Sequence, residues 1–121
     1  MIDIIPIDYG KSVLSERWIF ENGAENKLRP IVFRVYLIKT ENRLILVDAG
    51  CETMPGFVMT DFIGPVKALQ NIGVKADEIT DLIITHAHHD HIVNVQNILK
   101  MPPFISKRTS MRRGKAICLR T

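Results

Sequence analysis

The stretch Thr85-His86-Ala87-His88-His89-Asp90-His91 contains all four histidines of this 121-residue chain. Random scatter would very rarely gather them within six positions, so the clustering indicates a metal site. A solvated loop or a surface patch of histidines is disfavoured because the cluster directly follows the apolar run 82–84, which is typical of a buried strand. The internal position excludes an affinity tag.

The spacing of these side chains suits two metal ions. In an extended segment, residues i and i+2 point to the same side, so His86 and His88 can bind one metal together. If the chain then turns into a helix, Asp90 and His91 can reach a second metal close by, with mixed nitrogen and oxygen ligands. Two such metals lower the pKa of a shared water and can polarise a carbonyl, which describes hydrolysis of an ester-like bond by a metal-bound hydroxide.

Upstream of the histidines, the sequence predicts a β-hairpin. Residues 31–38 are rich in β-branched and aromatic side chains, as expected of a strand, and a turn follows at 40–43. The chain returns as the apolar run 44–47. This second strand delivers residues 48–50 to the far end of the hairpin, which is a candidate for a functional rim.

Between the hairpin and the histidines, the sequence predicts a loop over 51–60 and then a helix. The residues that indicate this helix are Asp61 and Pro65 at its start, Val66, Leu69 and Ile72 at helical spacing, and Gly73 at its end. A polar connector over 75–81 leads to the strand 82–84. A second helix is expected over 93–99, and two prolines shortly after it must end it. A further strand is expected over 104–106.

Two motifs in this order resemble the metallo-β-lactamase superfamily. The segment His86-Ala87-His88-His89-Asp90-His91 matches its HxHxDH motif, and Leu46-Val47-Asp48-Ala49-Gly50 matches its upstream strand-end motif. The resemblance implies an α/β fold, the αββα sandwich, with the metals at the rim between two sheets.

The same resemblance assigns roles to individual residues. It implies that His86 and His88 hold the first zinc and that Asp90 and His91 hold the second. Asp90 would also be the catalytic residue that orients the nucleophilic water or receives its proton, and Asp48 would support the site from beside it. Iron or manganese could replace zinc. His88 stands where flavin-linked di-iron oxidoreductases of the superfamily carry a carboxylate, which disfavours that branch.

Two nearby residues are not expected to be ligands. His89 occupies a variable position of the motif, which favours a pocket or surface role. Cys51 follows the strand-end motif closely and could approach the metals, but its position is more typical of a small buried hydrophobic residue.

The chain supplies only part of what the resemblance implies. Two of the predicted strands are apolar on almost every residue, which is typical of a sheet covered on both faces, whereas one or two helices can cover only one. After Asp90 there is no further Asp or Glu, and after His91 no further His, so the remaining metal ligands of the family are absent. Residues 1–106 are therefore interpreted as the N-terminal half of such a domain, from a truncated or frame-shifted product or from a longer enzyme.

Residues 107–121 form a basic tail, interpreted as disordered or non-native. The tail holds six of the sixteen basic side chains and no acid, which leaves ten basic against thirteen acidic residues in 1–106. The tail could contact phosphates, but it has no aromatic residue to stack on a base, so nucleic-acid binding is disfavoured. No apolar run is long enough to span a membrane, no secretory signal is visible, and two cysteines form no disulfide framework; the cytoplasm is expected.

The sequence thus favours a zinc-dependent hydrolase that opens a lactone or another small-molecule ester. The stretch from residue 29 to the histidines resembles lactonases that open acyl-homoserine lactones, while thioesterases of the glyoxalase II kind and RNA-processing nucleases share the motif. The alternative is a truncated, non-catalytic metal-binding or dimerisation module of the same fold. A homo-oligomer or a missing C-terminal half is expected to cover the open side of the sheet.

Overall fold

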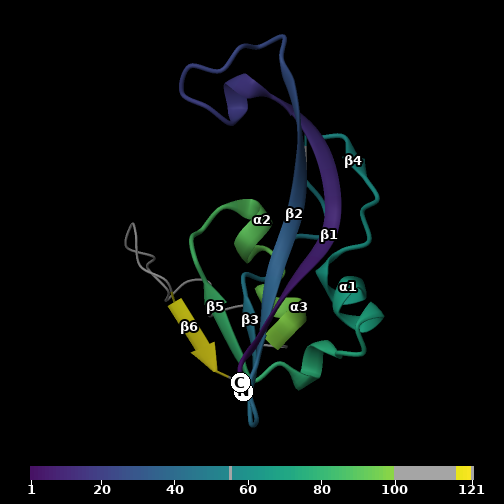
Figure 1. Ribbon diagram of the computed structural model, residues 1–121, viewed down its shortest axis with the longest axis vertical. Coiled ribbons are helices and arrows are strands. Elements are labelled where there is room, and N and C mark those ends of the chain that lie inside the picture. Colours follow the sequence, from purple (N-terminus) through teal and green to yellow (C-terminus); the bar gives the residue numbers. More distant parts are fainter. Residues whose placement is uncertain (55, 100–116, 121) are drawn as a thin grey trace.

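A single mixed sheet forms the framework of the protein in the computed structural model, which describes residues 1–54, 56–99 and 117–120 (Figure 1). Its six strands lie in the order β4-β1-β2-β3-β5-β6. The strands are β1 (Asp3–Ser15), β2 (Leu28–Lys39), β3 (Leu44–Val47), β4 (Met59–Thr60), β5 (Asp81–Ile84) and β6 (Ile117–Arg120). The helices are α1 (Pro65–Asn71), α2 (His89–Ile92) and α3 (Val95–Leu99), with 3-10 turns η1 (Glu16–Trp18) and η2 (Ala76–Glu78).

The hairpin β1–β2 is the longest feature of the sheet and was only half predicted. β2 contains the predicted strand 31–38, but β1 was not predicted. The two strands pair antiparallel from Asp3 opposite Lys39 to Ser15 opposite Leu28, with a register shift between Asp8 and Gly10. Figure 1 shows the far half of this hairpin and η1 projecting beyond the other elements. We call this part, residues 11–32, the arm.

The second hairpin, β2–β3, is confirmed as predicted. Its turn is closed by the backbone N–H of Thr40, which donates to the carbonyl of Arg43 at 2.9 Å. β3 then pairs in parallel with β5, so the chain between them must cross one face of the sheet. That crossover carries α1 and η2.

The helices differ from the prediction at their ends. α1 begins at Pro65 as predicted, but its N-cap is Gly64, whose φ of +82° suits glycine, and not the region of Asp61. Gly73, at φ +79°, follows the end of α1 as predicted. The helix expected over 93–99 is present as α3, which begins at Val95, and a separate short helix, α2, precedes it from His89. The strand expected over 104–106 lies outside the described residues.

The tail contributes one described element. Residues 117–120 form β6, which pairs antiparallel with β5 from Ile117 opposite Ile84 to Arg120 opposite Asp81. β6 is an edge strand of the sheet.

The core lies between the sheet and the elements α1, η2 and α3. Its fully buried members include Leu37, Leu46, Leu69, Leu82 and Ile98. Burying side chains of this size contributes about 1.5–3 kcal/mol each, so this layer supplies most of the stability. The described part of the chain thus forms an α/β layer pair.

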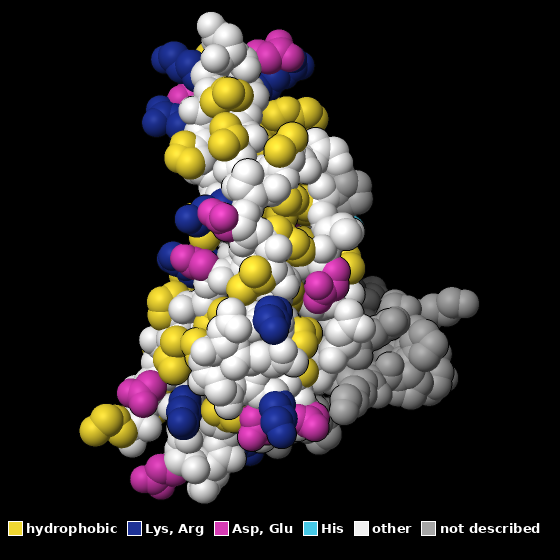
Figure 2. Space-filling model, turned by 90° about the vertical axis from the view of Figure 1, so that its right-hand side faces the viewer, with side chains coloured by type: hydrophobic (Ala, Val, Ile, Leu, Met, Phe, Trp, Pro, Cys, Tyr) yellow, Lys and Arg dark blue, Asp and Glu magenta, His cyan; other side chains and the backbone are white. Residues whose placement is uncertain are grey.

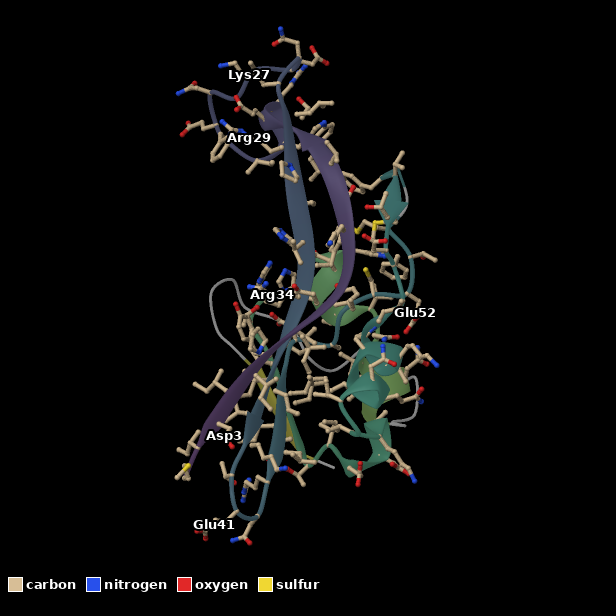
Figure 3. All side chains as sticks on the ribbon, turned by 45° about the vertical axis from the view of Figure 1, so that its right-hand side comes forward. Asp3, Lys27, Arg29, Arg34, Glu41 and Glu52 are labelled. Carbon is tan, nitrogen blue, oxygen red and sulfur yellow. The ribbon has the colours of Figure 1, made fainter. Side chains whose placement is uncertain are left out.

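The opposite side of the sheet, which we call the outer face, carries apolar side chains that no second layer of the described residues covers. The register places Tyr36 beside Val47, and Ile38 beside both Ile45 and Ile4. Ile4 is 65% exposed and Tyr36 is 41% exposed, although both belong to strands. Figure 3 shows Arg34 on this side of the sheet, away from α1, whereas Glu52 lies on the helix side. The outer face therefore matches the predicted open half of a sandwich.

The arm also carries exposed apolar side chains. Figure 2 shows several of them just below a charged tip. The exposed apolar residues of the arm are Val13, Trp18, Ile19, Phe20, Leu28 and Val32. No helix of the described residues is long and apolar enough to cross a membrane.

Candidate metal centre

The parallel strands β3 and β5 end at the same edge of the sheet and bring the two sequence motifs together. The backbone N–H of Asp48 donates to the carbonyl of Ile83 at 2.7 Å, which continues the ladder past the end of β3. Beyond that point both chains leave the sheet. The histidine segment, which starts after Ile84, therefore lies next to residues 48–50.

The four predicted ligands meet at this edge in two pairs. The Nε2 atom of His86 lies 3.1 Å from Nδ1 of His88, and both side chains are exposed. The Nε2 atom of His91 lies 3.3 Å from Oδ2 of Asp90, and both of these side chains are about a quarter exposed. The rings of His86 and His91 link the pairs, with centroids 3.9 Å apart.

The donor set fits metal ions at the level of each pair. Two nitrogens that each lie about 2.1 Å from a tetrahedral zinc are about 3.4 Å apart, which is close to the separation within each pair. Among the described residues, no group of three or more His, Cys, Asp or Glu is arranged to hold one ion. Each pair of side chains could therefore offer two ligands to one metal.

A hydrogen bond that Asp48 accepts sets which nitrogen of neutral His91 is free. Oδ2 of Asp48 lies 2.7 Å from Nδ1 of His91. A carboxylate only accepts at this distance, so Nδ1 carries a proton, and in the neutral tautomer Nε2 presents its lone pair toward Asp90. Because Asp90 is also an acceptor, a cation between the two atoms satisfies both.

The same carboxylate controls His86 through Thr85. The hydroxyl of Thr85 donates to Asp48, at 2.9 Å from each carboxylate oxygen. Since this uses the only proton of the hydroxyl, its oxygen accepts from Nδ1 of His86, 3.0 Å away. Nε2 of His86 is then also free of a proton. One carboxylate thus orients one histidine of each pair.

Asp48 is held in an unusual backbone conformation. Its φ is +66°, which is uncommon for a residue other than glycine, and the residue is buried. The backbone N–H of Thr85 donates to Oδ1 of Asp48 at 2.9 Å. The bonds to Thr85 and His91 offset the cost of this conformation, about 1–3 kcal/mol for such strained residues.

Backbone contacts from the end of β3 fix the segment that carries the second pair. The N–H of Ala49 donates to the carbonyl of His91 at 2.8 Å, and the N–H of Asn94 donates to the carbonyl of Gly50 at 3.1 Å. The side chain of Asn94 is fully buried, and its amide donates to Oε1 of Glu52 at 2.8 Å. α2 is therefore tied to residues 49–52.

The side chains of His89 and Cys51 contact groups other than the four predicted ligands. Nε2 of His89 lies 2.8 Å from the carbonyl oxygen of Thr53, away from the two pairs. Cys51 is fully buried, and its Sγ lies 3.8 Å from the hydroxyl of Tyr9. Both positions agree with the roles that the sequence favoured.

Three residues of the site were not singled out by sequence reasoning. Thr85 and Asn94 flank the histidines and connect them to residues 48–52. Tyr9 comes from β1, and its hydroxyl donates to the backbone carbonyl of Asp90 at 3.0 Å. Only Thr85 carried a local signal, because it directly precedes the motif.

Comparisons with known proteins agree with this geometry. The model of the metallo-beta-lactamase superfamily matches residues 34–106, and the chain belongs to this superfamily. Ribonuclease J of Mycolicibacterium smegmatis is 38% identical over 63 residues, which are 52% of this chain and 11% of that protein.

Solved structures of lactonases share the fold. A quorum-quenching N-acyl homoserine lactone lactonase is 30% identical, with a TM-score of 0.57, over 73% of this chain and 38% of its own. The dizinc quorum-quenching lactonase AidC is 24% identical, with a TM-score of 0.54, over 74% of this chain and 34% of its own. The chain thus spans well under half the length of these proteins. It has the fold of one αβ half of the metallo-β-lactamase αββα sandwich.

Proposed function

We propose that this chain forms the N-terminal, metal-binding half of a hydrolase that opens a lactone or another small-molecule ester. The observation that carries the proposal is the meeting of His86, His88, Asp90 and His91 in two pairs at one sheet edge. The likeness to lactonases supports the substrate class. We place the half-domain at residues 1–106, with residues 107–121 as an added basic segment.

The chain's own residues prepare the site for this chemistry. His86 and His88 would hold one zinc, and Asp90 and His91 the other; iron or manganese could also take these mixed nitrogen and oxygen ligands. When bound, the metals supply Lewis-acid activation of water and of the ester carbonyl. Asp48 accepts the Nδ1 proton of His91 and keeps its Nε2 free. The Asp90 carboxylate faces the same space, where it can accept the proton of the attacking water.

Metal content and turnover test this proposal together. A catalytic chain should bind two zinc ions by mass spectrometry and hydrolyse a member of a panel of acyl-homoserine lactones, thioesters and β-lactams. Asp90→Ala should abolish turnover, since it removes both a ligand and the proton acceptor. Asp3→Ala is the matched control, because Asp3 is an exposed carboxylate at the start of β1, and the register places it by the start of β3, whereas the site follows the end of β3. Metal-free, inactive protein would sink the catalytic proposal for this chain.

The outer face favours a second candidate, a non-catalytic module that dimerises. Contiguous exposed apolar surface on a sheet marks an interaction site. Either a second copy of this chain or the other half of a longer protein can cover it. In the first case both copies bring the same apolar strands to one interface.

A substitution that introduces a charge on the outer face tests whether two copies of the chain pair there. If two copies pair there, Tyr36→Lys should weaken dimerisation at least tenfold in sedimentation experiments, because each dimer gains two buried charges. Ile72→Lys is the control, since Ile72 is similarly exposed but lies at the end of α1, on the helix side. A wild-type chain that stays monomeric at high concentration would contradict the dimer.

We also propose that the protein acts in the cytoplasm, without a membrane or nucleic-acid partner. The low cysteine content supports the location, and the lack of aromatic residues in the basic segment speaks against base stacking. Binding to RNA or DNA that weakens steeply with salt would contradict the proposal that the protein has no nucleic-acid partner.

A further inference from the structure

Tyr9 is a buried residue of β1 whose hydroxyl reaches the candidate metal centre. The residue is 1% exposed. Its ring lies against Phe33, at 6.0 Å between centroids, and edge-on to Phe62, at 5.9 Å. These contacts fix the direction of the hydroxyl, which donates to the carbonyl oxygen of Asp90 at 3.0 Å.

The hydroxyl belongs to a short relay of hydrogen bonds. Tyr9 has one hydroxyl proton and gives it to Asp90, so the thiol of Cys51, 3.8 Å away, must be the donor to the Tyr9 oxygen. Burial raises the pKa of both Tyr9 and Cys51 above their ordinary values, which keeps both protonated. The relay therefore runs from Cys51 through Tyr9 to Asp90.

The carbonyl of Asp90 needs this partner because the helix does not supply one. In a continuing α-helix it would accept from the N–H of Asn94, four residues later. That N–H instead donates to the carbonyl of Gly50. α2 is only four residues long and cannot persist alone, so its geometry depends on contacts from outside it.

We propose that Tyr9 is a positioning residue, whose hydroxyl holds the backbone of Asp90 so that the side chains of Asp90 and His91 converge on one metal. The next carbonyl, that of His91, is held by the N–H of Ala49. Two consecutive peptide units are thus fixed from two different strands, β1 and the end of β3. This inference rests on the proposed function for its metal.

Tyr9→Phe tests the proposal, because it removes the hydroxyl and keeps the ring between Phe33 and Phe62. In a titration with Co²⁺ alone, we expect the affinity for the ion held by Asp90 and His91 to fall about tenfold, as for other groups that orient ligands. Tyr36→Phe is the matched control; it removes an exposed hydroxyl on the outer face and should leave both affinities unchanged.

Hydrogen exchange of the metal-free protein gives a second readout. The amide of Ala49, which donates to His91, should exchange at least tenfold faster in Tyr9→Phe, while the amide of Val74, bonded to Leu69 after α1, should not change. Equal acceleration of both amides would indicate general loosening and overturn the proposal, as would unchanged exchange at Ala49. A wild-type protein that binds no Co²⁺ would refute the proposed function, and exchange at Ala49 would still decide the role of Tyr9.

Discussion

Asp48→Asn should lower the affinity for zinc about 10- to 100-fold, the range for groups that orient metal-binding histidines. The carboxylate accepts from Nδ1 of His91 and from the hydroxyl of Thr85, which in turn accepts from His86. An amide keeps the size of the side chain but has only one acceptor atom, so it cannot satisfy both donors. At least one histidine then loses the protonation pattern that leaves its Nε2 free.

Asp81→Asn provides the control for this loss. Asp81 is a buried carboxylate at the other end of β5, where it accepts from Arg43 at 3.0 Å. Its replacement should reduce stability without a specific effect on zinc. Both affinities can be measured by competition with a chelator. Equal losses in the two variants would mean that Asp48 acts through stability alone.

Leu46→Ala should lower the free energy of unfolding by about 2–5 kcal/mol, whereas Ile45→Ala on the same strand should cost about 1 kcal/mol or less. Leu46 is fully buried under the helices, and Ile45 is half-buried on the outer face. Small domains have a total stability of only several kcal/mol, so the first change removes a large fraction of it.

Urea denaturation of both variants measures this difference. The contrast depends on an outer face that is open in solution. If Ile45→Ala proves as costly as Leu46→Ala, the outer face is packed against another layer, and the two-layer description is wrong for the protein in solution.

The elements that were predicted correctly are those with local signals. Residues 44–47 form an apolar run that ends in a rim motif, and Pro65 with Gly73 brackets α1. The strand β1 escaped prediction for physical reasons. Ile5, Ile7 and Tyr9 point to the core in alternation, but Pro6 interrupts the run, and the register shift at Gly10 breaks the period.

In the candidate site, too, the residues with a local sequence signal were predicted and the others were not. His86, His88, Asp90 and His91 lie within six residues, so their proximity could be inferred from spacing. Their supports could not, because those contacts join distant parts of the chain: Asp48 lies 43 residues before His91. Tyr9 lies 81 residues before Asp90, on a strand that was not predicted. Sequence spacing therefore located the ligands but not the framework that orients them.

The parallel pairing of β3 with β5 has a consequence for the order of folding. Parallel partners meet only after the intervening crossover has closed, which makes this contact slow relative to either hairpin. Until it forms, Asp48 is separated from Thr85 and His91, and the histidines are an unoriented peptide. On the proposed function, metal capture would follow assembly of the α/β layer, and zinc uptake would report that this layer has closed.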